Sequence, residues 1–147
     1  MRKLIPMVLA ATLAVAMLGT IGCSCDGTTD PSAALEGKTW VLESYGDPAS
    51  PAATLGTTEV TAIFTRESQG KINGSAGCNN YFGSYETDGY KITIGDLGST
   101  QMFCEGLMDQ EQQYLAALAT ADTFAVDGNS LKISCADGKT VLNYTVK

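Results

Sequence analysis

The amino-acid sequence predicts a mainly β domain with one α-helix: an α+β fold in which a strongly bent antiparallel sheet or small half-barrel packs against the helix. Three observations support this prediction. Short runs of alternating or β-branched residues recur from residue 38 onward, separated by turns that contain Gly, Asp and Asn. Nearly all connections between these runs are short, which favours antiparallel neighbours. Only one stretch has helical periodicity, and closure of the sheet would hide its edges.

The strands are predicted from their local residue patterns. The first alternates, with Trp40 and Leu42 on one face and Val41 and Glu43 on the other. Later runs are rich in β-branched and aromatic residues, and Asp-Gly pairs between them are typical of β-hairpins. The predicted strands cover residues 38–45, 60–65, 71–75, 80–86, 90–94, 97–103, 123–126, 130–134 and 140–146.

The single helix is predicted between residues 107 and 121. Asp109 and Glu111 would fall near its start, where acidic residues complement the positive end of the helix dipole. Alanines in its second half add helix propensity. The apolar residues with helical spacing are Leu107, Tyr114, Leu115 and Leu118.

Residues 1–22 have the pattern of a secretory signal peptide. A short basic start is followed by the uncharged, mostly apolar residues 4–22, and a glycine directly precedes Cys23. The segment resembles the lipobox of prokaryotic lipoproteins, in which the cysteine after the cleavage site carries a diacylglycerol on its sulfur. Thr20 stands where leucine is commoner in that pattern. The alternative is an uncleaved anchor, because about 20 apolar residues suffice to span a bilayer.

The predicted mature chain has a lipid-anchored flexible tether, residues 23–36, and one globular domain, residues 37–147. The tether is polar and rich in small residues and turn formers. Cleavage removes two basic residues, so the net charge falls from −7 to −9. A chain this acidic is not expected to bind nucleic acid. The signal and the tether together predict an exported protein, anchored on the extracytoplasmic face of a membrane.

The cysteines and the absence of histidine limit the chemistry. Without histidine the chain lacks the commonest general base and the commonest metal ligand. The other candidate ligands do not have the spacing of zinc or calcium sites, so no metal and no cofactor are predicted. If Cys23 carries the lipid, four cysteines remain, and they allow three disulfide connectivities. These four are Cys25, Cys78, Cys104 and Cys135.

Four segments together carry a family resemblance. Residues 74–85 read Gly-Ser-Ala-Gly-Cys-Asn-Asn-Tyr-Phe-Gly-Ser-Tyr, and residues 99–104 read Ser-Thr-Gln-Met-Phe-Cys. Residues 112–118 read Gln-Gln-Tyr-Leu-Ala-Ala-Leu, and the opening at residues 37–42 is Gly-Lys-Thr-Trp-Val-Leu. Over residues 36–147 the chain thereby resembles the META domain, the family that includes HslJ-type heat-inducible envelope proteins. The motif residues are Gly77, Cys78, Asn79, Tyr81, Gly83, Thr100, Met102 and Cys104.

The resemblance implies a compact β-rich domain with a helix, usual in exported proteins and often in lipoproteins. It also implies a link to stress response and envelope integrity, with no established catalytic activity. We therefore expect a non-enzymatic cell-envelope lipoprotein with a binding or scaffolding role. Its expected partners are the membrane, through the lipid anchor, and envelope proteins or peptides.

Cys78 and Cys104, on two segments of the family pattern, are expected to form a disulfide. A nucleophilic cysteine normally needs a nearby base, and no Cys-His pair can exist in this chain. A bridge between positions 26 residues apart would stabilise the fold by about 3 kcal/mol on the chain-entropy model. Cys25 and Cys135 would then form a second bridge, pinning the tether to the domain.

Two other functions stay open. A carrier of an apolar or lipid-like ligand would use aromatic side chains to line a cavity in the β fold. A hydrolase would use the acidic cluster of Glu105, Asp109 and Glu111 as paired carboxylates. Residues 74–85 are either a binding loop or, as their turn chemistry favours, a corner of the fold. The aromatic residues, most of them expected in the core, are Trp40, Phe64, Tyr81, Phe82, Tyr85, Phe103 and Tyr114.

Overall fold

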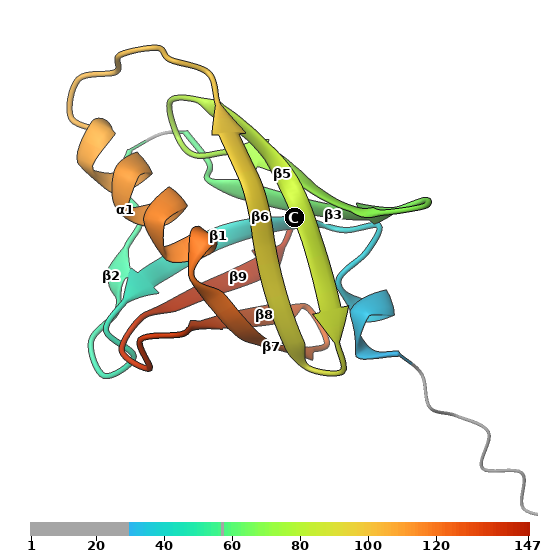
Figure 1. Cartoon of the computed structure of the whole chain (residues 1–147). Helices are drawn as coiled ribbons and strands as arrows, with labels where there is room; N and C mark the ends of the chain where they lie inside the picture. The colour runs from blue at the N-terminus through green and yellow to red at the C-terminus, as the bar shows by residue number, and fades with distance from the viewer. Residues whose placement is uncertain (1–29, 57) are drawn as a thin grey trace, which may run out of the picture.

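The computed structural model describes residues 30–56 and 58–147 (Figure 1). The elements are η1 (Pro31–Ala34), β1 (Thr39–Gly46), β2 (Ala52–Ala53), β3 (Thr61–Arg66), β4 (Gly70–Ser75), β5 (Asn80–Asp88), β6 (Lys91–Ser99), α1 (Met108–Ala119), β7 (Ala121–Asp127), β8 (Ser130–Cys135) and β9 (Val141–Val146). Eight antiparallel strands form a closed barrel with the helix packed against it. The mainly β fold with one helix is confirmed.

The barrel closes because β1 pairs with β3 on one side and with β9 on the other. The strand order around the barrel is β1-β3-β4-β5-β6-β7-β8-β9, so successive long strands are neighbours. The short β2 lies outside this ring and pairs with the end of β1. All strand pairs are antiparallel, as the short connections predict.

One part of the strand prediction is wrong. The predicted strands 90–94 and 97–103 are a single strand, β6, and residues 100–107 form a loop. The register between β5 and β6 shifts at Gly83, and opposite it Asp96 has a left-handed φ of 51°. A bulge of this kind interrupts the alternation of side chains without ending the strand.

Alternate residues of the strands fill the interior of the barrel. Trp40 and Leu42 of β1, predicted to share a face, are both buried, whereas Glu43 on the other face of the strand is exposed. The core is rich in large aromatic side chains, which bury much apolar area per residue. The largest fully buried aromatic residues are Trp40, Phe64, Tyr81, Tyr85, Tyr114 and Tyr144.

α1 packs where the barrel is most weakly paired. β6 and β7 share a single ladder pair, Lys91 with Thr123, since the chain leaves the sheet between them to form the loop and the helix. α1 lies beside β6 (Figure 1), and its inward face buries Tyr114 and Leu118 in the barrel core. The helix thus completes the wall that these two strands leave open.

The folded domain begins earlier than residue 37. Asp30 caps η1, because its Oδ1 accepts a hydrogen bond from Ser32 N at 3.0 Å. Leu35 is fully buried, and its carbonyl accepts a hydrogen bond from Trp40 Nε1 at 2.9 Å. The last residues assigned to the flexible tether therefore pack against the barrel as part of the domain.

The remainder of the predicted N-terminal organisation lies outside the described residues. This applies to the signal peptide at residues 1–22, to lipidation of Cys23 and to Cys25. Within residues 30–56 and 58–147, no helix is long and apolar enough to cross a membrane.

Candidate functional site

The turn and the loop that carry most of the motif residues meet at one end of the barrel, beside the first turn of α1, whereas Tyr81 and Gly83 lie within β5. A tight turn, residues 76–79, joins β4 to β5, and the loop of residues 100–107 joins β6 to α1. Cys78 of the turn and Cys104 of the loop form a disulfide, with their Cα atoms 5.8 Å apart. This confirms the predicted pairing and ties the two segments together covalently.

Asn79 holds the loop through its side-chain amide. Its Nδ2 donates to Met102 O at 2.9 Å and its Oδ1 accepts from Met102 N at 2.7 Å, so the amide pairs with both backbone polar groups of one residue. Oδ1 also accepts from Thr100 Oγ1 at 2.8 Å, and Nδ2 donates to Glu111 Oε1 at 2.7 Å. Every hydrogen-bonding position of this amide is therefore occupied, which fixes the loop on the turn.

Glu111 anchors the turn from α1. Its Oε2 accepts from Asn79 N at 2.7 Å and from Cys78 N at 3.3 Å, while Oε1 accepts from the Asn79 amide. The residue is only 5% exposed, and a buried carboxylate is tolerated when its oxygens are hydrogen-bonded in this way. The sequence predicted a dipole complement or a catalytic acid at Glu111 and missed this role, because its partners lie 32 and 33 residues away.

The neighbouring Gln110 holds a third segment. Its Oε1 accepts a hydrogen bond from Leu55 N, and its Nε2 donates to Leu55 O at 3.4 Å. Gln110 is buried, although nothing in the sequence pattern distinguishes it from a solvent-facing glutamine. The turn, the loop and the segment around Leu55 are thus all fixed to the first turn of α1.

The motif glycines have structural reasons. Gly77 has a φ of 109°, a conformation that side chains strongly disfavour. A Cβ atom at Gly83 would lie 2.8 Å from Gly95 O and 2.9 Å from Leu97 Cδ2, so only glycine fits at the bulge of β5 and β6. Both positions support the interpretation of residues 74–85 as a corner of the fold.

Three apolar side chains project into the solvent from the segments held by α1. Leu55 is 57% exposed, Met102 is 59% exposed and Phe103 is 81% exposed; we refer to these three residues as the apolar cap. The expectation that most of the seven aromatic residues lie in the core is confirmed, and the two exceptions are Phe103 and Phe82, which are exposed. The prediction of a strand over residues 97–103 does not anticipate this exposure, since residues 100–103 belong to the loop.

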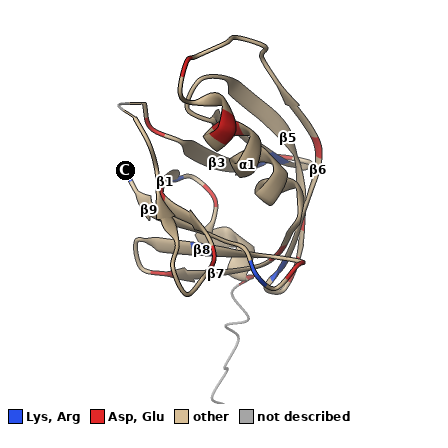
Figure 2. Ribbon diagram, turned by 90° about the vertical axis from the view of Figure 1, so that its left-hand side faces the viewer, with Lys and Arg blue, Asp and Glu red and all other residues tan. Residues whose placement is uncertain are grey.

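The three residues of the predicted acidic cluster do not share one environment. Glu105 and Asp109 are exposed, whereas Glu111 is buried and directed at Asn79. Figure 2 shows acidic residues on the loop and at the start of α1. In the part of the chain that the structure describes, no three His, Cys, Asp or Glu residues are grouped to hold a metal ion. Glu111, engaged with the turn, is therefore not free to pair with Glu105 or Asp109 as the hydrolase hypothesis would require of it.

The aromatic interior contains a chain of phenol hydroxyls. Tyr81 OH donates to Thr61 O at 2.9 Å, and since a phenol has one proton, Tyr114 OH must donate to Tyr81 OH at 2.8 Å. Tyr144 OH in turn donates to Tyr114 OH at 3.3 Å. Burial raises the pKa of all three phenols well above 10. These side chains fill the core and hydrogen-bond to one another.

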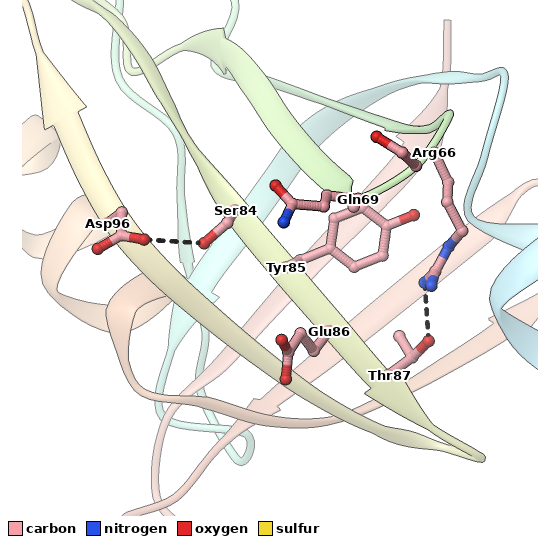
Figure 3. A pocket seen from close by; sticks show the side chains of 9 residues that line it. Arg66, Gln69, Ser84, Tyr85, Glu86, Thr87 and Asp96 are labelled. Carbon is pink, nitrogen blue, oxygen red and sulfur yellow. Dashed lines mark hydrogen bonds between the residues drawn. The ribbon is translucent and has the colours of Figure 1, made fainter.

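A polar depression of about 490 Å³ lies at the turn between β3 and β4 (Figure 3). The cation that lines the depression, Arg66, is already paired. Its Nη2 donates to Thr87 Oγ1 at 3.0 Å, and its Nε lies 2.9 Å from Glu36 Oε1. Burial and a hydrogen bond to Glu36 raise the pKa of Tyr85 to about 12. The labelled lining residues are Arg66, Gln69, Ser84, Tyr85, Glu86, Thr87 and Asp96.

Cys135 lies in β8 and is 3% exposed. Its thiol donates a hydrogen bond to Ala117 O at 3.2 Å, and burial raises the pKa of this thiol. The predicted partner, Cys25, lies outside the described residues, so the second disulfide stays a prediction.

Comparison with known proteins places this arrangement in context. A family model described as the META domain matches residues 33–146. No curated protein matches the chain. An NMR structure of a protein from Burkholderia xenovorans is 24% identical, with a TM-score of 0.66, over 97% of this chain and 99% of that chain. A second protein solved by NMR is 22% identical, with a TM-score of 0.58, over 79% and 93% of the two chains. A crystal structure of a DUF4847 family protein from Bacteroides vulgatus is 14% identical, with a TM-score of 0.56, over 76% and 93%. At these identities the likeness concerns the fold alone.

Proposed function

The chain belongs to the META domain family, and from this premise we propose that it is a non-enzymatic lipoprotein of the cell envelope that binds or scaffolds other envelope proteins or peptides. A lipid on Cys23 would hold the domain at the extracytoplasmic face of a membrane. More than one acyl chain is needed for stable anchoring, and a diacylated cysteine supplies two. The family's link to stress response and envelope integrity is consistent with this location.

The observation that carries the proposal concerns the loop of residues 100–107: buried polar side chains hold its backbone, and its apolar side chains are exposed. Asn79 and Glu111 are buried, and their oxygen and nitrogen atoms are engaged in holding the turn and the loop. Groups engaged in this way are poorly placed to act as a general base or a nucleophile. The loop that they hold exposes Met102 and Phe103, residue types that are enriched at protein interfaces. Binding is the activity that this arrangement supports best.

The carrier alternative receives less support. A ligand cavity needs open space lined by apolar side chains. The interior aromatic rings instead pack on one another, with the centroids of Tyr81 and Tyr114 5.7 Å apart and those of Phe64 and Tyr85 5.2 Å apart. The tyrosine hydroxyls also satisfy one another, which leaves little for a bound ligand to contact.

The intact mass of the full chain, purified from membranes with and without reduction, tests the proposal. We expect a chain that starts at Cys23, with added lipid mass, less the hydrogens of the Cys78–Cys104 disulfide. Reduction should restore those hydrogens, and a larger gain on reduction would show that Cys25 and Cys135 also pair.

The matched control is Cys23→Ala. This variant should keep residues 1–22 and carry no lipid, because the attachment sulfur is absent. A wild-type chain that keeps residues 1–22 without lipid would overturn the lipoprotein proposal and would indicate an uncleaved anchor instead.

A further inference from the structure

The apolar cap combines exposed apolar side chains with a backbone that is held by hydrogen bonds and a disulfide. Met102 and Phe103 are adjacent in the chain, and Leu55 lies on a segment that the same turn of α1 holds; each of the three side chains is more than half exposed. Gln110 pairs with both backbone polar groups of Leu55, and Asn79 pairs with both of those of Met102. Phe103 lies next to the disulfide-bonded Cys104. The backbone beneath the cap is therefore fixed while its side chains meet water.

A fixed backbone lowers the entropy that is lost when a partner binds. Ordering a loop and its side chains is a large part of the cost of association, and a preorganised surface has met this cost in folding. Phenylalanine and methionine on a rigid support suit an apolar pocket of a partner. These features favour recognition of another macromolecule over a role in packing within this chain.

The charge around the cap indicates the chemistry of the partner. Between Lys91 and Lys132 the sequence has no basic residue, and the exposed Glu105 and Asp109 follow Phe103 closely in the chain. Figure 2 shows acidic residues on this loop and at the start of α1. Complementary charge steers association and suppresses wrong partners. The cap therefore suits an apolar segment flanked by Lys or Arg. A second copy would bring the same carboxylates against each other, which is unfavourable.

The position of the tether makes the membrane itself a poor occupant. β5 runs from Asn80, beside the motif turn, toward Tyr90, which lies in one depression with Asp30 at the start of the described chain. The eight steps from Asn80 to Asp88 along β5 span about 27 Å. From Cys23 to Asp30 the chain reaches at most about 25 Å even when fully extended. A cap at the far end of the barrel thus faces away from a membrane that holds Cys23.

We propose that the apolar cap, Leu55 with Met102 and Phe103, is the docking site for a basic, apolar segment of another envelope protein. The inference rests on the proposed function for its location and for the direction of the tether. It adds the surface and the partner chemistry. Met102 and Phe103 insert into the apolar part of the segment, and Glu105 and Asp109 pair with its cations.

Fluorescence anisotropy of labelled synthetic peptides against the detergent-purified full chain tests the proposal. The probe is a short peptide of Leu and Lys, compared with one in which Glu replaces Lys and one in which Ser replaces Leu. We expect binding of the Leu-Lys peptide alone, weakened by salt. The double variant Met102→Ser/Phe103→Ser should weaken it by about tenfold or more, as loss of interface anchors does.

Two controls separate the cap from the general acidity of the chain. Tyr90→Ser removes another exposed aromatic residue, at the opposite end of the barrel, and should leave the affinity unchanged. Glu105→Gln/Asp109→Asn should weaken binding and reduce its salt dependence. Circular dichroism should show every variant folded, because all of these side chains are exposed.

Several results would overturn the inference. Equal affinity of the wild type and the Met102→Ser/Phe103→Ser variant would assign binding to overall charge, and no binding of the Leu-Lys peptide would remove the site. Self-association that depends on Phe103 would make a second copy the occupant. Phe103-dependent flotation with phosphatidylethanolamine–phosphatidylglycerol vesicles would make it a membrane. None of these results depends on the mass of the mature chain, so failure of the lipoprotein proposal would be seen separately.

Discussion

Replacement of Asn79 by alanine should destabilise the protein more than replacement of any other amide side chain in the motif region. The reason is that the Asn79 side chain joins three segments. The variant removes two hydrogen bonds to Met102, one from Thr100 and one to Glu111. It also leaves the backbone N–H and C=O of Met102 without their partners. The Glu111 carboxylate keeps only the two backbone donors of residues 78 and 79.

The expected size of the effect follows from these contacts. Each lost hydrogen bond contributes about 1 kcal/mol, and a bond to a charged group contributes somewhat more. Water can reach the Thr100 and Met102 side of the site, since both residues are exposed, and it recovers part of the loss. We therefore expect the free energy of unfolding to fall by about 3 kcal/mol in the Asn79→Ala variant.

Denaturant unfolding followed by tryptophan fluorescence measures this change. Trp40 is the only tryptophan in the sequence and is fully buried, so its emission reports global unfolding. The matched control is Asn73→Ala on the exposed face of β4, which should change stability by about 0.5 kcal/mol or less. An Asn79→Ala variant within about 1 kcal/mol of the wild type would refute the idea that the amide fixes the loop.

Four further predictions follow from the same contacts. Glu111→Gln should lower the free energy of unfolding by about 2 kcal/mol in the same denaturant assay, because all partners of this carboxylate are donors and an amide NH₂ would face one of them in either orientation. The double variant Cys78→Ser/Cys104→Ser should lower it by about 3 kcal/mol, and wild-type protein treated with reductant should match the variant. Tyr114→Phe should cost about 2 kcal/mol, since Tyr144 OH loses its acceptor and Tyr81 OH its donor; an unchanged unfolding midpoint would contradict the phenol chain. Stability should also fall as the pH rises from about 10 to 12: the folded-state pKa of Tyr85 is raised to about 12, so its contribution is complete below the unfolded pKa near 10 and is lost through the folded one. A pH titration of the unfolding midpoint, with Tyr85→Phe for comparison, checks this sign.

Much of the fold could be predicted from sequence because its signals are local. Alternation in β1 and the Asp-Gly turns depend on neighbouring residues, and these predictions agree with the structure. Two failures involve longer-range effects. The bulge at Asp96 interrupts the pattern of β6, so that one strand resembled two. The burial of Leu35 depends on a hydrogen bond from Trp40 and on packing against the barrel. Neither contact can be inferred from the polar, small-residue segment in which Leu35 lies.

The candidate site was only partly visible for a similar reason. The disulfide between Cys78 and Cys104 and the motif asparagine carry a family pattern, and the structure brings them together. Gln110 and Glu111 carry no such pattern, and their partners lie 55 and 32 residues away. The exposure of Phe103 could not be read from its residue type, which on average favours the core.

Asn79 and Glu111 form a polar latch, a pair of buried side chains that hold the turn and the loop. Its role becomes clear when it is compared with apolar side chains packed at the same positions. Replacing a buried charged or polar network with well-packed apolar residues is often neutral or stabilising, so stability alone does not account for a buried carboxylate here. Apolar packing is non-directional, however, and would not fix the backbone of Met102. The Asn79 amide fixes it from both sides, and the disulfide restrains the same loop at Cys104. The latch thus contributes position more than stability. The position of an exposed loop matters when its side chains are recognised, which connects the buried motif to the apolar cap and directs the search for a partner to that end of the barrel.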